Sequence, residues 1–161
     1  MTLAIRHAVP GDEGLILAMV KALAAYERDP DAVQATEQTI RDSMFADGAT
    51  VHAFIAEIEG APVGFALWFL TWSTWTGRPS LYLEDLFVAE NARRRGAARA
   101  LFRKLAREAV ARNCARVDWA VLDWNRSAMA FYERIGARRQ RGWQPWRLHG
   151  EALMRLAAEA D

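Results

Sequence analysis

A turn in the middle of the chain has the residue types that bind a phosphate group. An apolar stretch ends at Val88, and the spacing Arg93-x-x-Gly96-x-Ala98 then leads into small and basic residues that suit the start of a helix. A helix N-terminus presents unpaired N–H groups and the positive end of the helix dipole, and small residues let an anion approach closely. The turn is neither a P-loop, since no Gly-Lys-Ser/Thr follows, nor a Rossmann fingerprint. Taken alone, it is also compatible with a solvated, arginine-rich helix start.

Two carboxylates interrupt the apolar stretch that precedes this turn. Glu84 and Asp85 lie within Leu-Tyr-Leu-Glu-Asp-Leu-Phe-Val, residues 81–88, which has the composition of a strand. Because neighbouring strand residues face opposite sides, at least one carboxylate points where an apolar side chain is expected. Carboxylates are rarely buried without a partner, so this pair is a candidate for chemistry or for charge pairing.

The composition restricts the class of protein. The chain has 161 residues, of which 52% are hydrophobic and 25% are charged, as in a globular domain and unlike a disordered chain. We therefore predict one domain over residues 1–161. No apolar run approaches the roughly 18 residues of a membrane span, and the N-terminus shows no secretory signal. The single Cys114 forms neither an internal disulfide nor a cysteine-based zinc site, which favours the cytoplasm.

The net charge of +1 conceals a local basic segment. Residues 1–60 hold ten acids and four bases, whereas residues 90–116 hold nine bases and two acids. A basic segment in a nearly neutral chain indicates one anionic ligand at one place. Nucleic-acid binding through the arginines is disfavoured, because no basic surface extends elsewhere.

Hydrophobic periodicity and turn residues predict the elements that position these groups. The predicted strands are residues 3–8, 50–58, 62–72, 81–88 and 116–122, with one or two closing strands before a polar tail. Four helices are predicted. The first begins at residues 10–12 and ends near 25, and the second is capped by Thr36 and ends near 45. The other two span about 96–112 and 126–135. The order βααβββαβαβ predicts an α/β or α+β fold with a mixed sheet.

Two motifs together resemble one enzyme family. The 93–98 spacing after an apolar strand is similar to the pyrophosphate-binding signature of the GNAT acetyltransferase superfamily, and Asn-x-x-Ala-x-x-Phe-Tyr-x-x-x-Gly over residues 125–136 is similar to its second hallmark. Further stretches resemble the diamine (spermidine/spermine) and thialysine N-acetyltransferase branch: residues 25–27, 64–66, 82–88, 124–125 and 146–148. The likeness extends over about residues 3–156. It implies the GNAT fold, whose sheet splays between strands 81–88 and 116–122 to admit acetyl-CoA.

The resemblance implies where acetyl-CoA binds as cosubstrate. The backbone of Leu86, Phe87 and Val88 would pair with the pantetheine amides as if they were another strand. The cosubstrate-binding residues of the turn would be Arg93, Arg94, Arg95, Gly96, Ala97, Ala98 and Arg99, mainly through backbone N–H groups that hold the pyrophosphate. Asn125 would hydrogen-bond the pantetheine arm or serve as a plain helix N-cap, and these two roles are compatible. The resemblance implies no metal.

The resemblance also implies which groups move protons. Glu84 would accept the proton of the substrate amine through ordered water, and partial burial would favour that role. Tyr132 would protonate the leaving thiolate, since a phenol stays protonated at neutral pH; the alternative is a core aromatic residue. Tyr26 and Glu27 would line the amine site, although Glu27 also suits an ordinary solvated face. Asp85 would line the same site or serve as a structural or charge-pairing group.

We therefore expect an N-acetyltransferase that acts by direct transfer on a primary amine of a small molecule: a diamine, a polyamine or a lysine analogue. The alternatives are a protein or peptide N-acetyltransferase and a non-catalytic acyl-CoA sensor. Glu84 and Tyr132 together argue against the sensor, which needs neither.

The loops bear on the size of the amine and on assembly. The resemblance implies further acids in polyamine-using members at residues 71–75 and 142–146, where this chain has none, which favours a shorter amine. Trp72, Trp75 and Trp124 are candidates for packing alkyl stems or shielding ammonium groups, or for core or interface packing. The family usually forms dimers, and the apolar segment 68–75 suits a homodimer interface.

Overall fold

A five-stranded sheet in the order β1-β2-β3-β4-β5 organises the first part of the chain. The computed structural model describes residues 2–159, which form two compact units. The boundary between the units in the sequence falls after residue 125. The first unit contains β1 (Leu3–His7), α1 (Glu13–Tyr26), α2 (Glu37–Phe45), β2 (Val51–Ile58), β3 (Ala61–Ser73), β4 (Arg78–Val88), the 3₁₀ turn η1 (Glu90–Ala92), α3 (Ala97–Ala111) and β5 (Val117–Asp118). The second contains α4 (Arg126–Arg134) and α5 (Gly150–Ala157). The extent of a single domain stays a prediction.

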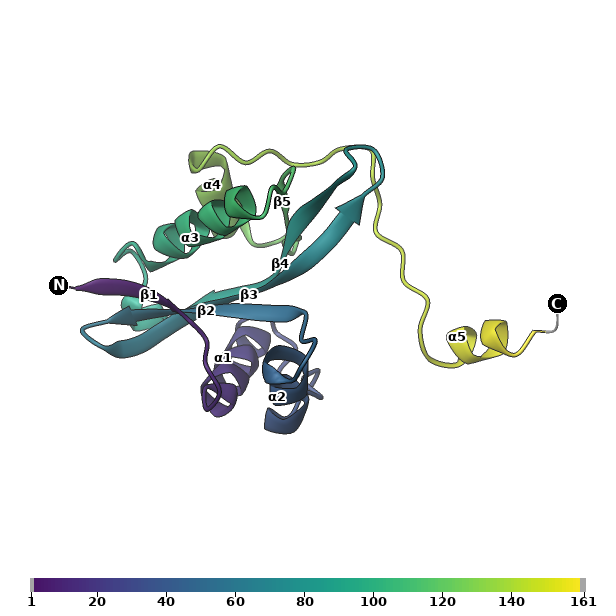
Figure 1. Ribbon diagram of the computed structural model, residues 1–161, viewed down its shortest axis with the longest axis horizontal. Helices are drawn as coiled ribbons and strands as arrows, with labels where there is room; N and C mark the ends of the chain where they lie inside the picture. The colour runs from purple at the N-terminus through teal and green to yellow at the C-terminus, as the bar shows by residue number, and fades with distance from the viewer. Residues whose placement is uncertain (1, 160–161) are drawn as a thin grey trace. The chain divides into compact units, whose positions relative to one another are not determined.

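The sheet is mixed, as the order of elements predicted. Neighbouring strands from β1 to β4 are antiparallel, and β4 and β5 are parallel. Figure 1 shows α1 and α2 on one face of the sheet and α3 on the other. The predicted order of elements is confirmed from β1 through α4, although β5 is much shorter than predicted, and Thr36 caps α2 by accepting a hydrogen bond from the N–H of Thr39.

Both faces of the sheet are covered by apolar side chains. On the α1 and α2 face a buried cluster joins both helices to β2 and β3: Ile16, Met19, Ile40, Met44, Ala53, Ile55 and Phe65. On the α3 face, the ammonium of Lys104 lies 5.4 Å from the ring centre of Phe54, and the guanidinium of Arg112 lies 5.2 Å from that of Trp68. Trp68 is fully buried, so it belongs to the core and not to the exposed segment expected over residues 68–75.

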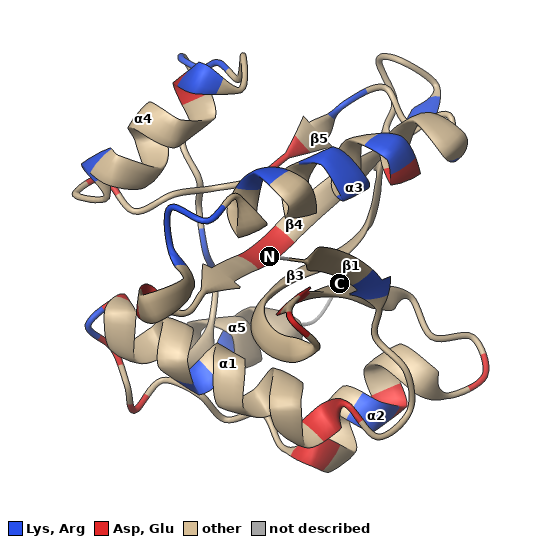
Figure 2. Ribbon diagram, turned by 90° about the vertical axis from the view of Figure 1, so that its left-hand side faces the viewer, with Lys and Arg blue, Asp and Glu red and all other residues tan. Residues whose placement is uncertain are grey.

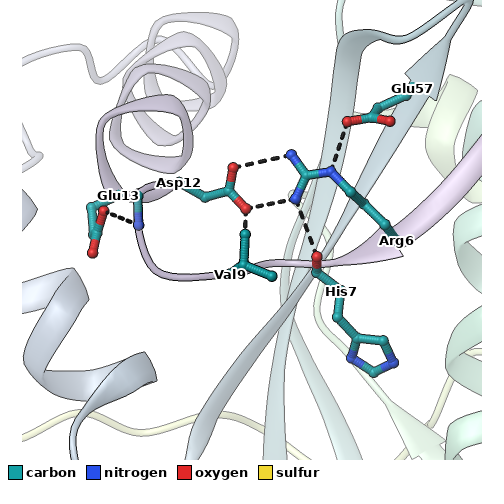
Figure 3. A network of polar contacts seen from close by, with 7 residues as sticks. Arg6, His7, Val9, Asp12, Glu13 and Glu57 are labelled. Carbon is teal, nitrogen blue, oxygen red and sulfur yellow. Dashed lines mark hydrogen bonds and ion pairs between the residues drawn. The ribbon is translucent and has the colours of Figure 1, made fainter.

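A charged network fixes the start of α1 against the sheet (Figure 3). The Arg6 guanidinium on β1 donates two hydrogen bonds to the Asp12 carboxylate, at 2.6 and 3.0 Å, and one to Glu57 on β2 at 2.7 Å. Asp12 also accepts a bond from the N–H of Val9, and the bond from Arg6 lowers the pKa of Asp12. One buried carboxylate therefore holds the β1–α1 connection and with it the direction of α1.

Two predicted features of the C-terminal third are wrong. The strand expected over residues 116–122 is limited to Val117–Asp118, because β5 and β4 pair only at Leu81↔Val117 and Tyr82↔Asp118. The closing strands expected near the end do not occur within residues 137–159, where the one regular element is α5. A strand extends only as far as a neighbouring strand pairs with it. The residue pattern of one segment cannot predict where its neighbour diverges, and therefore where the strand ends.

Two further classes of structure are missing between residues 2 and 159. No helix there is long and apolar enough to cross a membrane. No group of three or more His, Cys, Asp or Glu side chains there is arranged to hold a metal ion. That the protein works without a metal stays a prediction.

Candidate active site

The strand β4 is paired along the whole of one edge and open along most of the other. On one side it pairs with β3 from Arg78 to Val88. On the other side β5 reaches only Leu81 and Tyr82, so no strand of the described chain pairs with that edge from residue 83 to residue 88. An extended ligand that carries amides can add to such an edge as a further strand would. The divergence of β4 and β5 agrees with the splayed sheet that the family resemblance implies.

A β-bulge on β4 decides where its two carboxylates point. Leu67 pairs with Asp85 and the next residue, Trp68, pairs with Leu83, so Glu84 is an extra residue on β4. A bulge of this kind breaks the strict alternation of side chains and re-aims them. Asp85 is half-buried on the face that Leu67 shares with the α1 and α2 cluster, whereas Glu84 is exposed. The burial that we expected for Glu84 therefore belongs to Asp85.

Three carboxylates share one electrostatic environment. Burial, reinforced by the nearby charges of Glu84 and Glu27, raises the pKa of Asp85 from 3.8 to about 6. Partial desolvation also raises the pKa of Glu27, although this side chain keeps access to solvent. Within residues 2–159 none of the three forms an ion pair with a protein cation. The charge-pairing alternative for Asp85 is therefore not supported, and the site presents unneutralised negative charge to a ligand.

The end of α1 places two of the predicted substrate-binding residues beside this acidic site. The helix closes with a Schellman turn, in which the N–H of Arg28 bonds to Ala25 and the N–H of Asp29 bonds to Ala24. Glu27 is the C-cap residue that follows the last residue of α1, and it lies within electrostatic reach of Asp85.

An aromatic pair flanked by arginines lies next to these carboxylates. The Tyr26 ring lies 5.9 Å from that of Trp124. The Arg93 guanidinium lies 4.7 Å from the centre of the Tyr26 ring, and that of Arg28 lies 4.5 Å from the centre of the Trp124 ring. Sequence reasoning missed Arg28 altogether and assigned Arg93 to phosphate binding alone. No local signal identifies such contacts, because the stacked residues are far apart in the chain.

The turn before α3 has the geometry of an anion site. Arg94 and Gly96 both adopt positive φ, at 62° and 87°, and α3 then begins at Ala97 with no side chain capping its first N–H groups. Residues 93–96 are exposed. Figure 2 shows basic residues along this turn and α3, close to the acidic segment of β4. An uncapped helix start beside arginines fits a pyrophosphate, so the residues present suit the phosphates of acetyl-CoA.

The two remaining predicted site residues are Asn125, the last residue of the first unit, and Tyr132, which lies in the second unit. Asn125 is half-buried, and its backbone N–H bonds to the carbonyl of Leu122 at 2.9 Å. Tyr132 lies on α4, half-buried, with its ring 5.8 Å from that of Phe131. Their roles stay predictions.

The raised pKa of Asp85 leads to a prediction about stability. The folded protein binds the Asp85 proton more tightly than the unfolded chain does, so the charged carboxylate costs stability above pH about 6 and nothing below pH about 4. We expect Asp85→Asn to raise the free energy of unfolding by roughly 1 to 3 kcal/mol at pH 7.5 and by much less at pH 4. Urea unfolding at both pH values measures this. Asp31→Asn, at an exposed position, should show no such difference, and equal effects of Asp85→Asn at both pH values would contradict the assignment.

Comparison with known proteins identifies the family. Residues 17–137 match the Acetyltransferase (GNAT) family. The thialysine N-epsilon-acetyltransferase of Sus scrofa is 38% identical over 166 aligned positions, which cover 96% of this chain and 97% of that protein. A spermidine/spermine N(1)-acetyltransferase-like protein of Homo sapiens is 32% identical over 96% of this chain, but the alignment covers only 24% of that protein.

A solved structure has the same fold over the full length. An integron cassette protein from the mobile metagenome of V. cholerae matches with a TM-score of 0.82 and 27% identity, covering 99% of each chain. The mixed sheet, the open edge of β4 and the uncapped start of α3 agree with this match. The chain therefore belongs to the GNAT acetyltransferase family, whose members use acetyl-CoA as cosubstrate, and it is an acetyltransferase.

Proposed function

We propose that this enzyme transfers an acetyl group directly to the primary amine of a small molecule that carries one or two positive charges, such as a lysine analogue or a short diamine. The observation that carries the proposal is the half-buried Asp85, which lies near Glu84 and Glu27 without a protein cation. An ammonium group bound there would supply the missing countercharge. The similarity to a thialysine N-epsilon-acetyltransferase supports an amine of this size.

Acetyl-CoA, which supplies the acetyl group as a thioester, would bind at the open edge of β4 and the turn that follows. The backbone of residues 86–88 would pair with the pantetheine amides, and the turn residues 93–99 would hold the pyrophosphate. Asn125 would hold the pantetheine arm. The uncapped start of α3 and the unpaired edge of β4 support these assignments.

The chemical step needs one base and one acid. Glu84 would take the ammonium proton through water, so that the neutral amine attacks the thioester carbon. The C–N bond forms and the C–S bond breaks, and Tyr132 would donate its proton to the leaving sulfur. The nitrogen loses its second proton as the amide forms, and that proton, passed through water, would restore the Tyr132 hydroxyl. The bulge leaves Glu84 exposed, where water that would relay the proton can reach it, although this is not the partial burial that we expected for the base. Asp85 is half-buried and would hold the substrate ammonium.

Long polyamines are poor partners for this arrangement. An ammonium that leaves water without a partner costs free energy, and cation–π contact recovers only about 0.5 to 2 kcal/mol. Arg28 and Arg93 already cover faces of Trp124 and Tyr26, so these two rings are occupied by cations. Guanidinium groups there would also repel the distal ammonium groups of spermine.

We also propose a cytoplasmic homodimer. Trp72 and Trp75 are 66% and 87% exposed, which is unusual for two large rings in one segment and supports a surface that a second copy covers. The single cysteine supports a reducing compartment.

An amine panel tests the proposed activity. Purified enzyme with acetyl-CoA should release thiol in the presence of thialysine or a short diamine, with kcat/KM at least about tenfold above that for spermine because of the unmatched distal charges. Spermidine and a lysine-containing peptide complete the panel. A preference for spermine would make the enzyme a polyamine acetyltransferase, and a preference for the peptide would favour the protein-acetylation alternative.

The phosphate site is tested at Gly96. Gly96→Glu would place a negative charge where the pyrophosphate binds and should weaken acetyl-CoA binding at least about tenfold, measured by titration calorimetry. Gly96→Ala is the matched control, since it shares the strain of a side chain at φ 87° but adds no charge. Equal losses in the two variants would show that strain is responsible and not charge.

The general acid is tested at Tyr132. Tyr132→Phe keeps the ring and removes the hydroxyl, so acetyl-CoA binding should change little while kcat falls about 100-fold. Steady-state kinetics with the best amine of the panel measures this, together with a pre-steady-state check that chemistry limits the rate. A wild-type kcat under those conditions would mean that another group protonates the thiolate.

A further inference from the structure

The side chain of Arg93 leaves the phosphate turn and faces the acceptor side of the site. Arg93 is the first residue of the Arg-x-x-Gly-x-Ala spacing, so its backbone belongs to the turn. Its guanidinium, however, lies 4.7 Å from the centre of the Tyr26 ring at the end of α1. Its Nε also donates a hydrogen bond of 3.3 Å to the carbonyl of Val88, the last residue of β4. One side chain thus touches both the strand that would hold the pantetheine and the wall of the amine site.

The contact is one end of a stack of four side chains. In order, these are Arg93, Tyr26, Trp124 and Arg28; the two rings lie 5.9 Å apart and are tilted by 54°, and a guanidinium lies over each ring. Neither guanidinium forms an ion pair with a carboxylate in the described part of the chain, so the rings are their principal partners. Cation–π contacts of this kind fix the planes of both partners.

Backbone strain at the other end indicates that the stack is maintained. Arg28 occupies the C′ position of the Schellman turn with φ 68°, where glycine is strongly preferred. A residue other than glycine in this conformation persists only when its surroundings determine it, and such residues concentrate at functional sites. Glu27 lies between Tyr26 and Arg28 in the sequence, so residues of the stack hold its backbone on both sides.

We propose that Arg93 is a positioning residue for the amine acceptor: it holds Tyr26, and through it Glu27, against the end of β4. The inference rests on the proposed function, because it concerns the amine that the acidic site would bind. Phosphate binding in the turn is left to backbone N–H groups and to the neighbouring basic side chains. Removal of the Arg93 guanidinium should therefore loosen the amine site more than the acetyl-CoA site.

The test separates the two sites by their constants. In Arg93→Gln we expect the KM for the best amine to rise about 5- to 10-fold, while the Kd for acetyl-CoA, measured by calorimetry, changes less than about twofold. Arg93→Lys keeps a cation for the ring and should recover part of the lost KM. Lys21→Gln removes a positive charge from an exposed position on α1, outside the basic segment, and both constants should stay at wild-type values.

A double-mutant cycle tests whether Arg93 acts through Tyr26. Tyr26→Leu should also raise the KM for the amine. The double variant with Arg93→Gln should have a KM no higher than that of the more impaired single variant, because both substitutions remove the same contact. Additive effects would overturn the inference. If Arg93→Gln does not fold, the same cycle is measured with Arg93→Met, which also removes the cation but keeps an unbranched side chain, and thermal unfolding gives the folded fraction.

The remaining outcomes are distinguishable. An increase in the acetyl-CoA Kd with an unchanged amine KM would make Arg93 a phosphate ligand and overturn the inference. A wild-type enzyme that acetylates no amine of the panel would overturn the proposed function, whereas an active enzyme whose amine KM is insensitive to Arg93→Gln would overturn the positioning role alone.

Discussion

The open edge of β4 is the constraint on which the rest of the site depends. Every buried backbone N–H and C=O group needs a partner, and β5 provides partners only at Leu81 and Tyr82. From residue 83 onwards the strand keeps an edge that a ligand with amides can use. The turn that leads to α3 starts at the end of this edge, so the strand edge and the turn proposed for the pyrophosphate follow one another directly along the chain.

The same strand holds Asp85, the carboxylate whose charge is unfavourable in the folded protein. The bulge at Glu84 allows one carboxylate to stay in solvent while Asp85 turns toward the α1 and α2 face. Burial beside two other carboxylates is unfavourable for Asp85, as its raised pKa shows. Functional sites often keep such unfavourable charge because a ligand of opposite charge relieves it. The neighbouring core cluster is apolar, so the free-energy cost of a buried charge is confined to Asp85.

Helix α1 links the two halves of the site because both of its ends are anchored. At its start, Arg6 joins Asp12 and Glu57, so the helix keeps its direction relative to β1 and β2. At its end, the stack that includes Arg28 and Arg93 joins it to residue 124 and to the phosphate turn. Glu27 is therefore held at the end of a helix that can neither slide nor rotate freely, and binding groups need this rigidity.

The sequence by itself determined the family and the order of elements through α4, and it predicted an anion site at the turn 93–99, because periodicity, caps and small residues act over a few positions. It also placed two carboxylates in an apolar strand. Only the tertiary structure decided that Asp85 is the buried one, since a bulge depends on the partner strand β3. It also shortened β5, replaced the expected closing strands with α5, and turned Arg93 toward Tyr26. Pairing, burial and stacking join residues far apart in the chain, and no local pattern encodes them.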